Sequence, residues 1–155
     1  MLSKELIDLM NNREFISVAT CDFKGRPNAV PKFVLKVEHD RVYLVDYTIG
    51  TTLKNLKINP RISMSLIDTR TLKGYQLNGS VHIMTRGKLY DKMRSEMMDK
   101  EVRLTTQRII DEVRGHPTHE TFEVLISEKF VIFEVRIDEV VEMDIHGGLK
   151  RSKKE

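Results

Sequence analysis

The sequence is poor in several residues that mark particular classes of protein. Its 155 residues include no tryptophan and a single cysteine, Cys21. One cysteine excludes an internal disulfide and a cysteine-rich zinc site, and we expect this thiol to pack rather than to react. No apolar run approaches the roughly 20 residues of a membrane span, and the N-terminus lacks the apolar core of a signal peptide. These absences predict a cytoplasmic protein that does not bind membranes.

Outside the end of the chain, neither positive nor negative charge is in excess. The net charge is +3, but residues 150–155 alone hold four Lys/Arg and one acid, which leaves 22 basic and 22 acidic residues elsewhere. A neutral body argues against a nucleic-acid surface, because such a surface needs a basic face. We predict one domain over residues 1–149, followed by a basic, disordered tail at 150–155.

Most of the chain alternates apolar and polar residues with the period of a β-strand. The predicted strands cover residues 15–21, 28–38, 42–47, 62–66, 75–83, 122–126, 131–137 and, as a short addition, 140–145. Short turns join most of them, which favours a closed or partly closed antiparallel barrel over a parallel sheet. The fold class is therefore mainly β, a barrel of six to seven strands with helices.

Two further segments have helical spacing. Residues 3–11 predict a short amphipathic helix. Residues 85–115 change to a charged, methionine-containing pattern that predicts two helices with a break near 99–101. His116 and His119 follow, but the proline between them prevents a helix from bringing both side chains to one face, and no third metal ligand is evident. We interpret them as turn residues and predict no metal site.

Irregular positions within the strands indicate where a ligand could approach. Ser17, Ala19 and Cys21 give the first strand one face of small side chains, which a flat or bulky group could contact closely. Pro31 predicts an edge or a bulge in the second strand, and Gly79 predicts a bulge or sharp bend later in the sheet. Beside Pro31, Lys32 either extends its ammonium to solvent or faces an anionic ligand.

The segment from Asp46 to Arg61 is the strongest candidate for a binding site. A strand ends, Gly50 makes a turn, and Thr51 and Thr52 open a short helix that also carries Lys54 and Lys57 before the Asn59-Pro60 stop. The first turn of a helix presents free backbone N–H groups, and these bind phosphates and other anions. Threonine also begins many helices simply as a cap, so this segment alone leaves both interpretations open.

Several motifs in order give the sequence a family resemblance. They are Ile16 to Thr20, Gly25-x-Pro27-Asn28-x-Val30-Pro31-Lys32, Val42 to Asp46, Gly50-x-Thr52-x-x-Asn55-Leu56-x-x-Asn59-Pro60-Arg61, and Gly74-Tyr75-Gln76-Leu77-x-Gly79. Over residues 14–84 this pattern resembles the FMN-binding split β-barrel family, also called pyridoxamine-phosphate-oxidase-like. The resemblance implies a split barrel that forms a homodimer, with FMN held across the dimer interface.

The resemblance also implies where the parts of FMN lie. The phosphate would meet the start of the short helix, the flavin ring would lie beside residues 30–32, and the ribityl chain would follow residues 46–48. The insertion at 85–115 and the end at 144–148 would close the substrate side. The predicted cofactor-binding residues are Val30, Pro31, Lys32, Asp46, Tyr47, Thr48, Thr51, Thr52, Lys54 and Asn55.

Two departures from the family pattern limit the functional prediction. The family usually has lysine immediately before the helix threonine, where this chain has Thr51, so positive charge at the phosphate must come from Lys32, Lys54, Lys57 or the second subunit. The arginine-rich C-terminal segment with a tryptophan, which binds substrate in the enzyme that names the family, is not visible. True pyridoxamine-phosphate oxidase activity is therefore not expected.

Three functions fit these observations. The first is an FMN-dependent oxidoreductase acting on a small molecule or redox donor, in which the cofactor carries the chemistry. The second is a flavin-binding or electron-relay module without catalysis of its own. The third is a family member that binds a deazaflavin or heme instead of FMN. No acid–base pair stands out, so the sequence assigns no catalytic residue.

Overall fold

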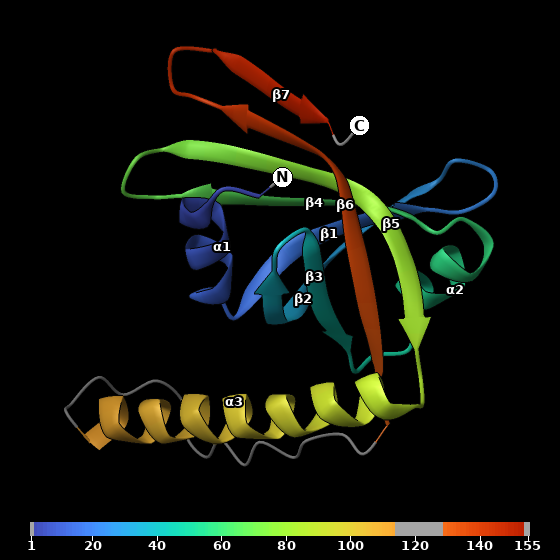
Figure 1. Cartoon of the computed structure of the whole chain (residues 1–155), viewed down its shortest axis with the longest axis vertical. Coiled ribbons are helices and arrows are strands. Elements are labelled where there is room, and N and C mark those ends of the chain that lie inside the picture. Colours follow the sequence, from blue (N-terminus) through green and yellow to red (C-terminus); the bar gives the residue numbers. More distant parts are fainter. Residues whose placement is uncertain (1, 114–128, 154–155) are drawn as a thin grey trace.

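The computed structural model describes residues 2–113 and 129–153, which form an antiparallel β-barrel with three helices (Figure 1). The strands are β1 (Phe15–Cys21), β2 (Pro27–Glu38), β3 (Arg41–Asp46), β4 (Arg61–Asp68), β5 (Lys73–Met84), β6 (Val131–Met143) and β7 (Leu149–Lys153). The helices are α1 (Lys4–Asn11), α2 (Thr51–Ile58) and α3 (Lys88–Val113).

The pairing of the strands closes the barrel. The sheet order is β3-β2-β1-β4-β5-β6-β7, and β3 also pairs with β6 from Asp46↔Val131 to Arg41↔Arg136. Six strands therefore form a closed ring, and β7 adds to the outer edge of β6. This arrangement confirms the predicted mainly β barrel, and α2 confirms the predicted short helix after the third strand.

The two irregular positions expected within strands are confirmed. Residues from Pro27 to Phe33 pair with β1, whereas β3 pairs with β2 only from Phe33 onward, so Pro31 lies on a local edge. The pairing of β5 with β6 shifts register between Asn78 and Gly79. A side chain at Gly79 would place its Cβ 2.2 Å from the carbonyl oxygen of Arg136, so this close approach requires glycine.

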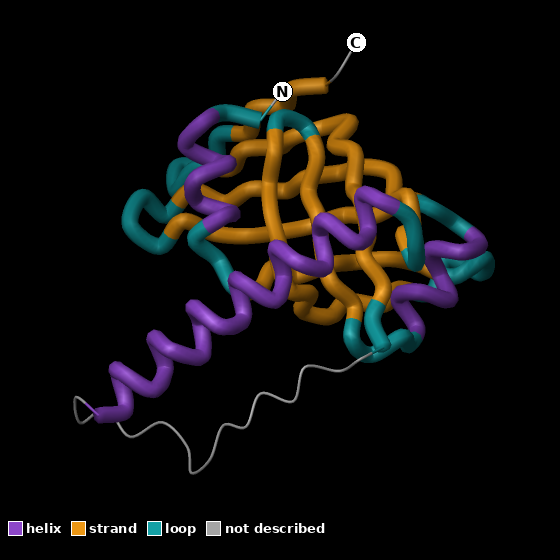
Figure 2. The backbone as a smooth tube through the Cα atoms, turned by 60° about the horizontal axis from the view of Figure 1, so that its bottom comes forward, coloured by secondary structure: helices purple, strands orange, loops and turns teal. Residues whose placement is uncertain are grey.

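Two apolar clusters lie on opposite sides of the barrel wall. Val18, Leu44 and Met64 belong to the cluster inside the barrel, to which α1 contributes Leu6 and α2 contributes Leu56. A second cluster joins the outside of the barrel to the first half of α3 and contains Phe33, Leu35, Tyr43, Val45, Met84, Met93, Met97, Phe130 and Ile132. Figure 2 shows α3 crossing the barrel on this side and its second half continuing beyond it.

Three sequence predictions were wrong. Helix α3 runs without a break through residues 99–101, since Lys100 and Glu101 both contact the barrel and are good helix formers. Strand β6 is continuous over the predicted 131–137 and 140–145 segments. Residues 150–153 are not a disordered tail but belong to β7, because this segment pairs antiparallel with β6; Arg151 and Lys153 also form ion pairs with Glu139 of β6.

Other expectations fall outside the described residues. The predicted strand at 122–126, the predicted end of the helical region at residue 115, and His116 and His119 all lie within 114–128. Among the helices of the described residues, none has the length and apolar character needed to cross a membrane.

Candidate functional site

The start of helix α2 lies at the turn that the sequence marked as the candidate binding site. Strand β3 ends at Asp46, and the helix begins at Thr51 with Gly50 as its N-cap. Gly50 has no side chain and no side-chain cap hydrogen bond forms, so the first N–H groups of α2 lack the partner that Ser3 supplies to α1. Thr51 is exposed at this point. The turn therefore combines free donors with one accessible hydroxyl.

The other predicted side chains of α2 face inward. Thr52 is 2% exposed, and its Oγ1 accepts a hydrogen bond from Asn28 Nδ2 at 3.1 Å. Asn55 is also buried, and its Nδ2 donates to Thr20 Oγ1 at 3.1 Å. These two bonds fasten α2 to β1 and β2. Of the threonine pair, only Thr51 offers its side chain to a ligand, whereas Lys54 extends from the exposed face of the helix.

Lys32 does not extend its ammonium to solvent. It is 5% exposed, and its Nζ lies 2.6 Å from Oδ1 of Asp46, which is fully buried. Thr48 joins the pair, since its hydroxyl donates to the same Oδ1 at 2.7 Å and lies 3.2 Å from Lys32 Nζ. The ammonium is thus neutralised within the protein. A phosphate at α2 must obtain its positive charge from Lys54, Lys57 or a second subunit.

One atom of this cluster has no partner. Asp46 Oδ2 is buried and accepts no hydrogen bond in the described part of the chain. A buried carboxylate oxygen without a donor is costly, because folding removes it from water. Asp46 has no surface open to solvent, so exposed Thr48 is the member of this cluster that can meet a ligand hydroxyl. The ribityl chain of FMN carries such hydroxyls, so the chemistry of these residues fits the cofactor.

Tyr47 points toward helix α3. Its hydroxyl donates to Glu101 Oε1 at 2.9 Å, and its ring meets Phe33 edge-on with the centroids 6.4 Å apart. Burial, followed by the charge of Glu101, raises the pKa of Tyr47 well above its usual value, so the phenol keeps its proton at neutral pH. The sequence did not indicate Glu101, because the two residues are separated by 54 positions and have no common motif.

The loop between β3 and α2 holds an unusual backbone conformation. Ile49 has φ = 46°, in the left-handed region that β-branched residues seldom adopt. Such conformations cost about 1–3 kcal/mol and are concentrated at binding and catalytic sites. The strained residue is next to Gly50, at the open end of α2. No feature of the sequence pattern indicated this strain.

On the outer surface of the barrel, three neighbouring strands share one face of small side chains. Across β2, β1 and β4, the facing residues on one side are small, and we call this set the small-residue face: Ser17, Ala19, Ala29, Pro31, Ser63 and Ser65. This arrangement extends the pattern expected for β1 to three strands. A pocket of about 410 Å³ lies at its margin, between Ala19, Cys21, Arg61 and Glu139. Val30 is half-buried on the opposite side of β2 from Pro31.

A closed antiparallel barrel whose third strand leads into a short helix defines the split β-barrel class. A family model for pyridoxamine 5'-phosphate oxidase matches residues 2–143, and the chain belongs to this family. The family resemblance noted in the sequence is thus confirmed. No curated protein matches the sequence significantly.

Solved structures show the same fold. HupZ from Group A Streptococcus is 22% identical with a TM-score of 0.65, and the match covers 97% of this chain and 99% of that protein. HutZ, a heme storage protein from Vibrio cholerae, is 18% identical with a TM-score of 0.60 over 96% and 93% of the two chains. An FMN-binding protein from Nostoc punctiforme is 11% identical with a TM-score of 0.57 over 99% and 98%.

Proposed function

We propose that this protein is an FMN-binding flavoprotein, and that it acts as an oxidoreductase on a small molecule. The observation that carries the proposal is the uncapped start of α2 with exposed Thr51, within a chain of this family. Free N–H groups at a helix start favour a phosphate. Bound FMN would supply the electron-transfer chemistry itself.

The chain's own residues would divide the binding between them. The α2 N–H groups and the Thr51 hydroxyl would hold the phosphate, with Lys54 or Lys57 adding positive charge. Exposed Thr48 would meet the ribityl hydroxyls, and buried Asp46 would orient it by accepting a hydrogen bond from its hydroxyl. Buried Lys32 would orient Asp46 through the 2.6 Å contact instead of binding the phosphate directly.

The protein is further proposed to act as a homodimer through the small-residue face. A flat surface without long side chains allows close approach of a second copy. The isoalloxazine beside Pro31 would then be covered by the partner, and a single barrel would hold FMN weakly.

The absorbance spectrum of the purified protein tests which cofactor is bound. Two flavin bands, with FMN released on denaturation, are the expected result. A Soret band would instead indicate heme, and a deazaflavin spectrum a third cofactor. These alternatives are relevant because similar structures include a heme storage protein and an F420 reductase. A colourless protein that takes up no added FMN would contradict the proposal.

Substitutions at the helix start test the assigned site. Thr51→Ala removes one hydroxyl contact and is expected to weaken FMN binding about two- to tenfold, since a hydrogen bond contributes about 0.5–1.5 kcal/mol. Isothermal titration calorimetry with FMN measures this change. Thr52→Ala should chiefly lower the melting temperature, because that hydroxyl is bonded to Asn28.

Thr69→Ala, at an exposed position in the turn between β4 and β5, is the matched control and should change neither property. Unaltered FMN affinity in Thr51→Ala would place the phosphate elsewhere. Catalysis is tested separately, by whether a nicotinamide donor reduces the bound flavin with turnover. Absence of turnover would leave the binding module as the function.

A further inference from the structure

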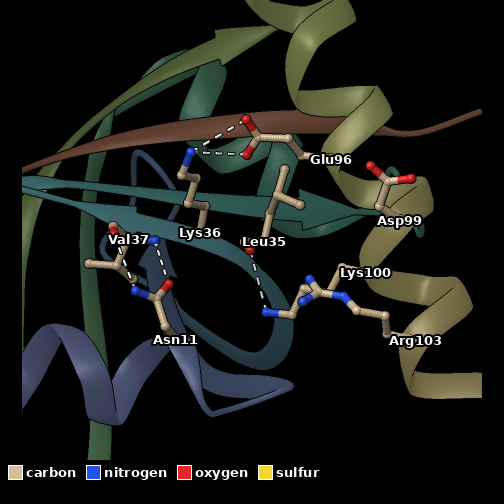
Figure 3. A pocket seen from close by; sticks show the side chains of 8 residues that line it. All are labelled: Asn11, Leu35, Lys36, Val37, Glu96, Asp99, Lys100 and Arg103. Atoms are coloured by element: carbon tan, nitrogen blue, oxygen red, sulfur yellow. Dashed lines mark hydrogen bonds and ion pairs between the residues drawn. The ribbon is translucent and has the colours of Figure 1, made fainter. Parts of the chain in front are cut away.

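A second pocket lies between strand β2 and helix α3, and it shares no residue with the proposed FMN site. Its volume is about 500 Å³, and it is lined by Asn11, Leu35, Lys36, Val37, Glu96, Asp99, Lys100 and Arg103 (Figure 3). The two elements that form its walls are separated by about 60 positions in the sequence. The pocket therefore exists only because α3 packs across the outside of the barrel.

The floor of the pocket is a part of β2 that has no neighbouring strand on one side. Two side chains form hydrogen bonds with its backbone there. β1 begins at Phe15 and pairs with β2 no further than Phe33, so residues 35–38 have no strand on that side. Asn11 instead bonds both the N–H and the carbonyl of Val37, at 2.8 and 3.3 Å. Lys100 Nζ donates to the carbonyls of Val34 and Leu35 at 2.5 and 3.4 Å.

The charges around the pocket are only partly balanced. Lys36 forms ion pairs with Glu38 and Glu96. Arg103 and Asp99 form no ion pair or hydrogen bond with any residue in the described ranges. Figure 3 shows the Arg103 and Lys100 side chains extending from α3 toward β2. Lys100 and Arg103 thus lie on one side of the pocket without an ion pair to a carboxylate in the described ranges, although Asp99 lines the same pocket.

The environment of Lys100 reflects this imbalance. Burial, and next the positive charge of Arg103, lower the pKa of Lys100, although Glu14 and Glu101 act in the opposite direction. The ammonium also lies over the ring of Phe33, 5.2 Å from its centroid, so its position is fixed. Two adjacent cations, one of them held in place, repel each other until an anion lies between them.

We propose that this pocket binds a small organic anion whose charged group lies between Lys100 and Arg103. Leu35 and Val37 would contact its apolar part. The adjacent Asp99 and Glu96 disfavour a polyanion such as a nucleic acid, because extended negative charge would meet both carboxylates. This inference does not depend on FMN binding, since none of these residues contributes to the α2 site.

Titration of the full-length protein with succinate and, separately, inorganic phosphate tests the proposal, monitored by the backbone amide resonances of β2 and α3. Saturable shifts in the millimolar range are expected for at least one probe, and the tighter probe identifies a carboxylate or a phosphate ligand. Arg103→Gln should weaken binding about tenfold or more, since charge-assisted hydrogen bonds are the strong ones. Arg94→Gln, exposed on the same helix outside the pocket, is the control with the same change in charge.

Three results would overturn the proposal. The first is that neither probe saturates. The second is that Arg103→Gln and Arg94→Gln weaken binding equally, which indicates unspecific attraction. The third is that phosphate binding is unchanged in Arg103→Gln but weaker in Thr51→Ala, which assigns it to α2. Because Arg103 is exposed, its substitution is compatible with folding, and an unchanged amide spectrum outside the pocket verifies this.

Discussion

At the level of single residues, Lys32 and Asp46 form a buried ion pair. Both side chains are almost fully removed from water, at 5% and 0% exposure, and they meet at 2.6 Å. Removing charges from water is costly, and the ion pair recovers that cost only while both partners are present. The pair therefore makes the end of β3, and with it the loop that leads to α2, sensitive to any change of charge.

Asp46→Asn is expected to lower the free energy of unfolding by about 3–5 kcal/mol, because it leaves a buried ammonium without its counter-charge. Urea unfolding measures the loss. The double variant Lys32→Met/Asp46→Leu should recover most of it, since neither charge remains. As a control, Asp138→Asn breaks the exposed pair with Arg61 and should cost about 1 kcal/mol or less. Equal losses in Asp46→Asn and Asp138→Asn would contradict the role of burial.

At the level of helices and strands, the sequence pattern correctly predicted the features that depend on neighbouring residues in the chain. The period of two indicated the strands, and the Gly-Thr-Thr start with the Asn-Pro stop gave the bounds of α2 closely. The break expected near residues 99–101 was wrong because α3 is held by distant residues, such as Val34, whose carbonyl Lys100 contacts. The pairing of Lys32 with Asp46 and of Tyr47 with Glu101 was likewise invisible, since it depends on strand and helix packing.

Gly79 shows how one residue can determine the course of a strand. Gly79→Ala is expected to lower the free energy of unfolding by about 3 kcal/mol or more, because its Cβ would lie 2.2 Å from the Arg136 carbonyl oxygen in a paired strand that cannot move away. Thermal or urea unfolding measures the effect.

Gly74→Ala on the same strand is the control for this prediction. Its new Cβ would lie 3.3 Å from the terminal methyl of Met143, which can move by a few tenths of an ångström, and at an ordinary contact distance of 3.6 Å from Met143 Cβ. A small loss is therefore expected there. Similar losses in the two variants would mean that the bulge at Gly79 tolerates a side chain.

At the level of the whole molecule, the barrel presents two different outer surfaces. The side covered by α3 carries the second apolar cluster and the charged pocket. The small-residue face has no helix over it among the described residues, and its strands β1 and β2 also hold α2 through Thr20 and Asn28. A cofactor at α2 would reach this uncovered face, so cofactor binding and self-association are expected to be linked.

Ser17→Arg tests this linkage. Ser17 is exposed and pairs with Pro31 on one side and Ser65 on the other, which places an arginine in the middle of the small-residue face without disturbing the barrel. The long charged side chain would keep a second copy away, so light scattering should report a monomer, whereas a dimer is expected for the unaltered protein. FMN affinity should fall at least tenfold with it, because the partner no longer covers the flavin.

Thr69→Arg, in the turn between β4 and β5, adds the same charge away from this face and should preserve both properties. A Ser17→Arg monomer that still binds FMN with full affinity would show that one barrel is sufficient for the cofactor.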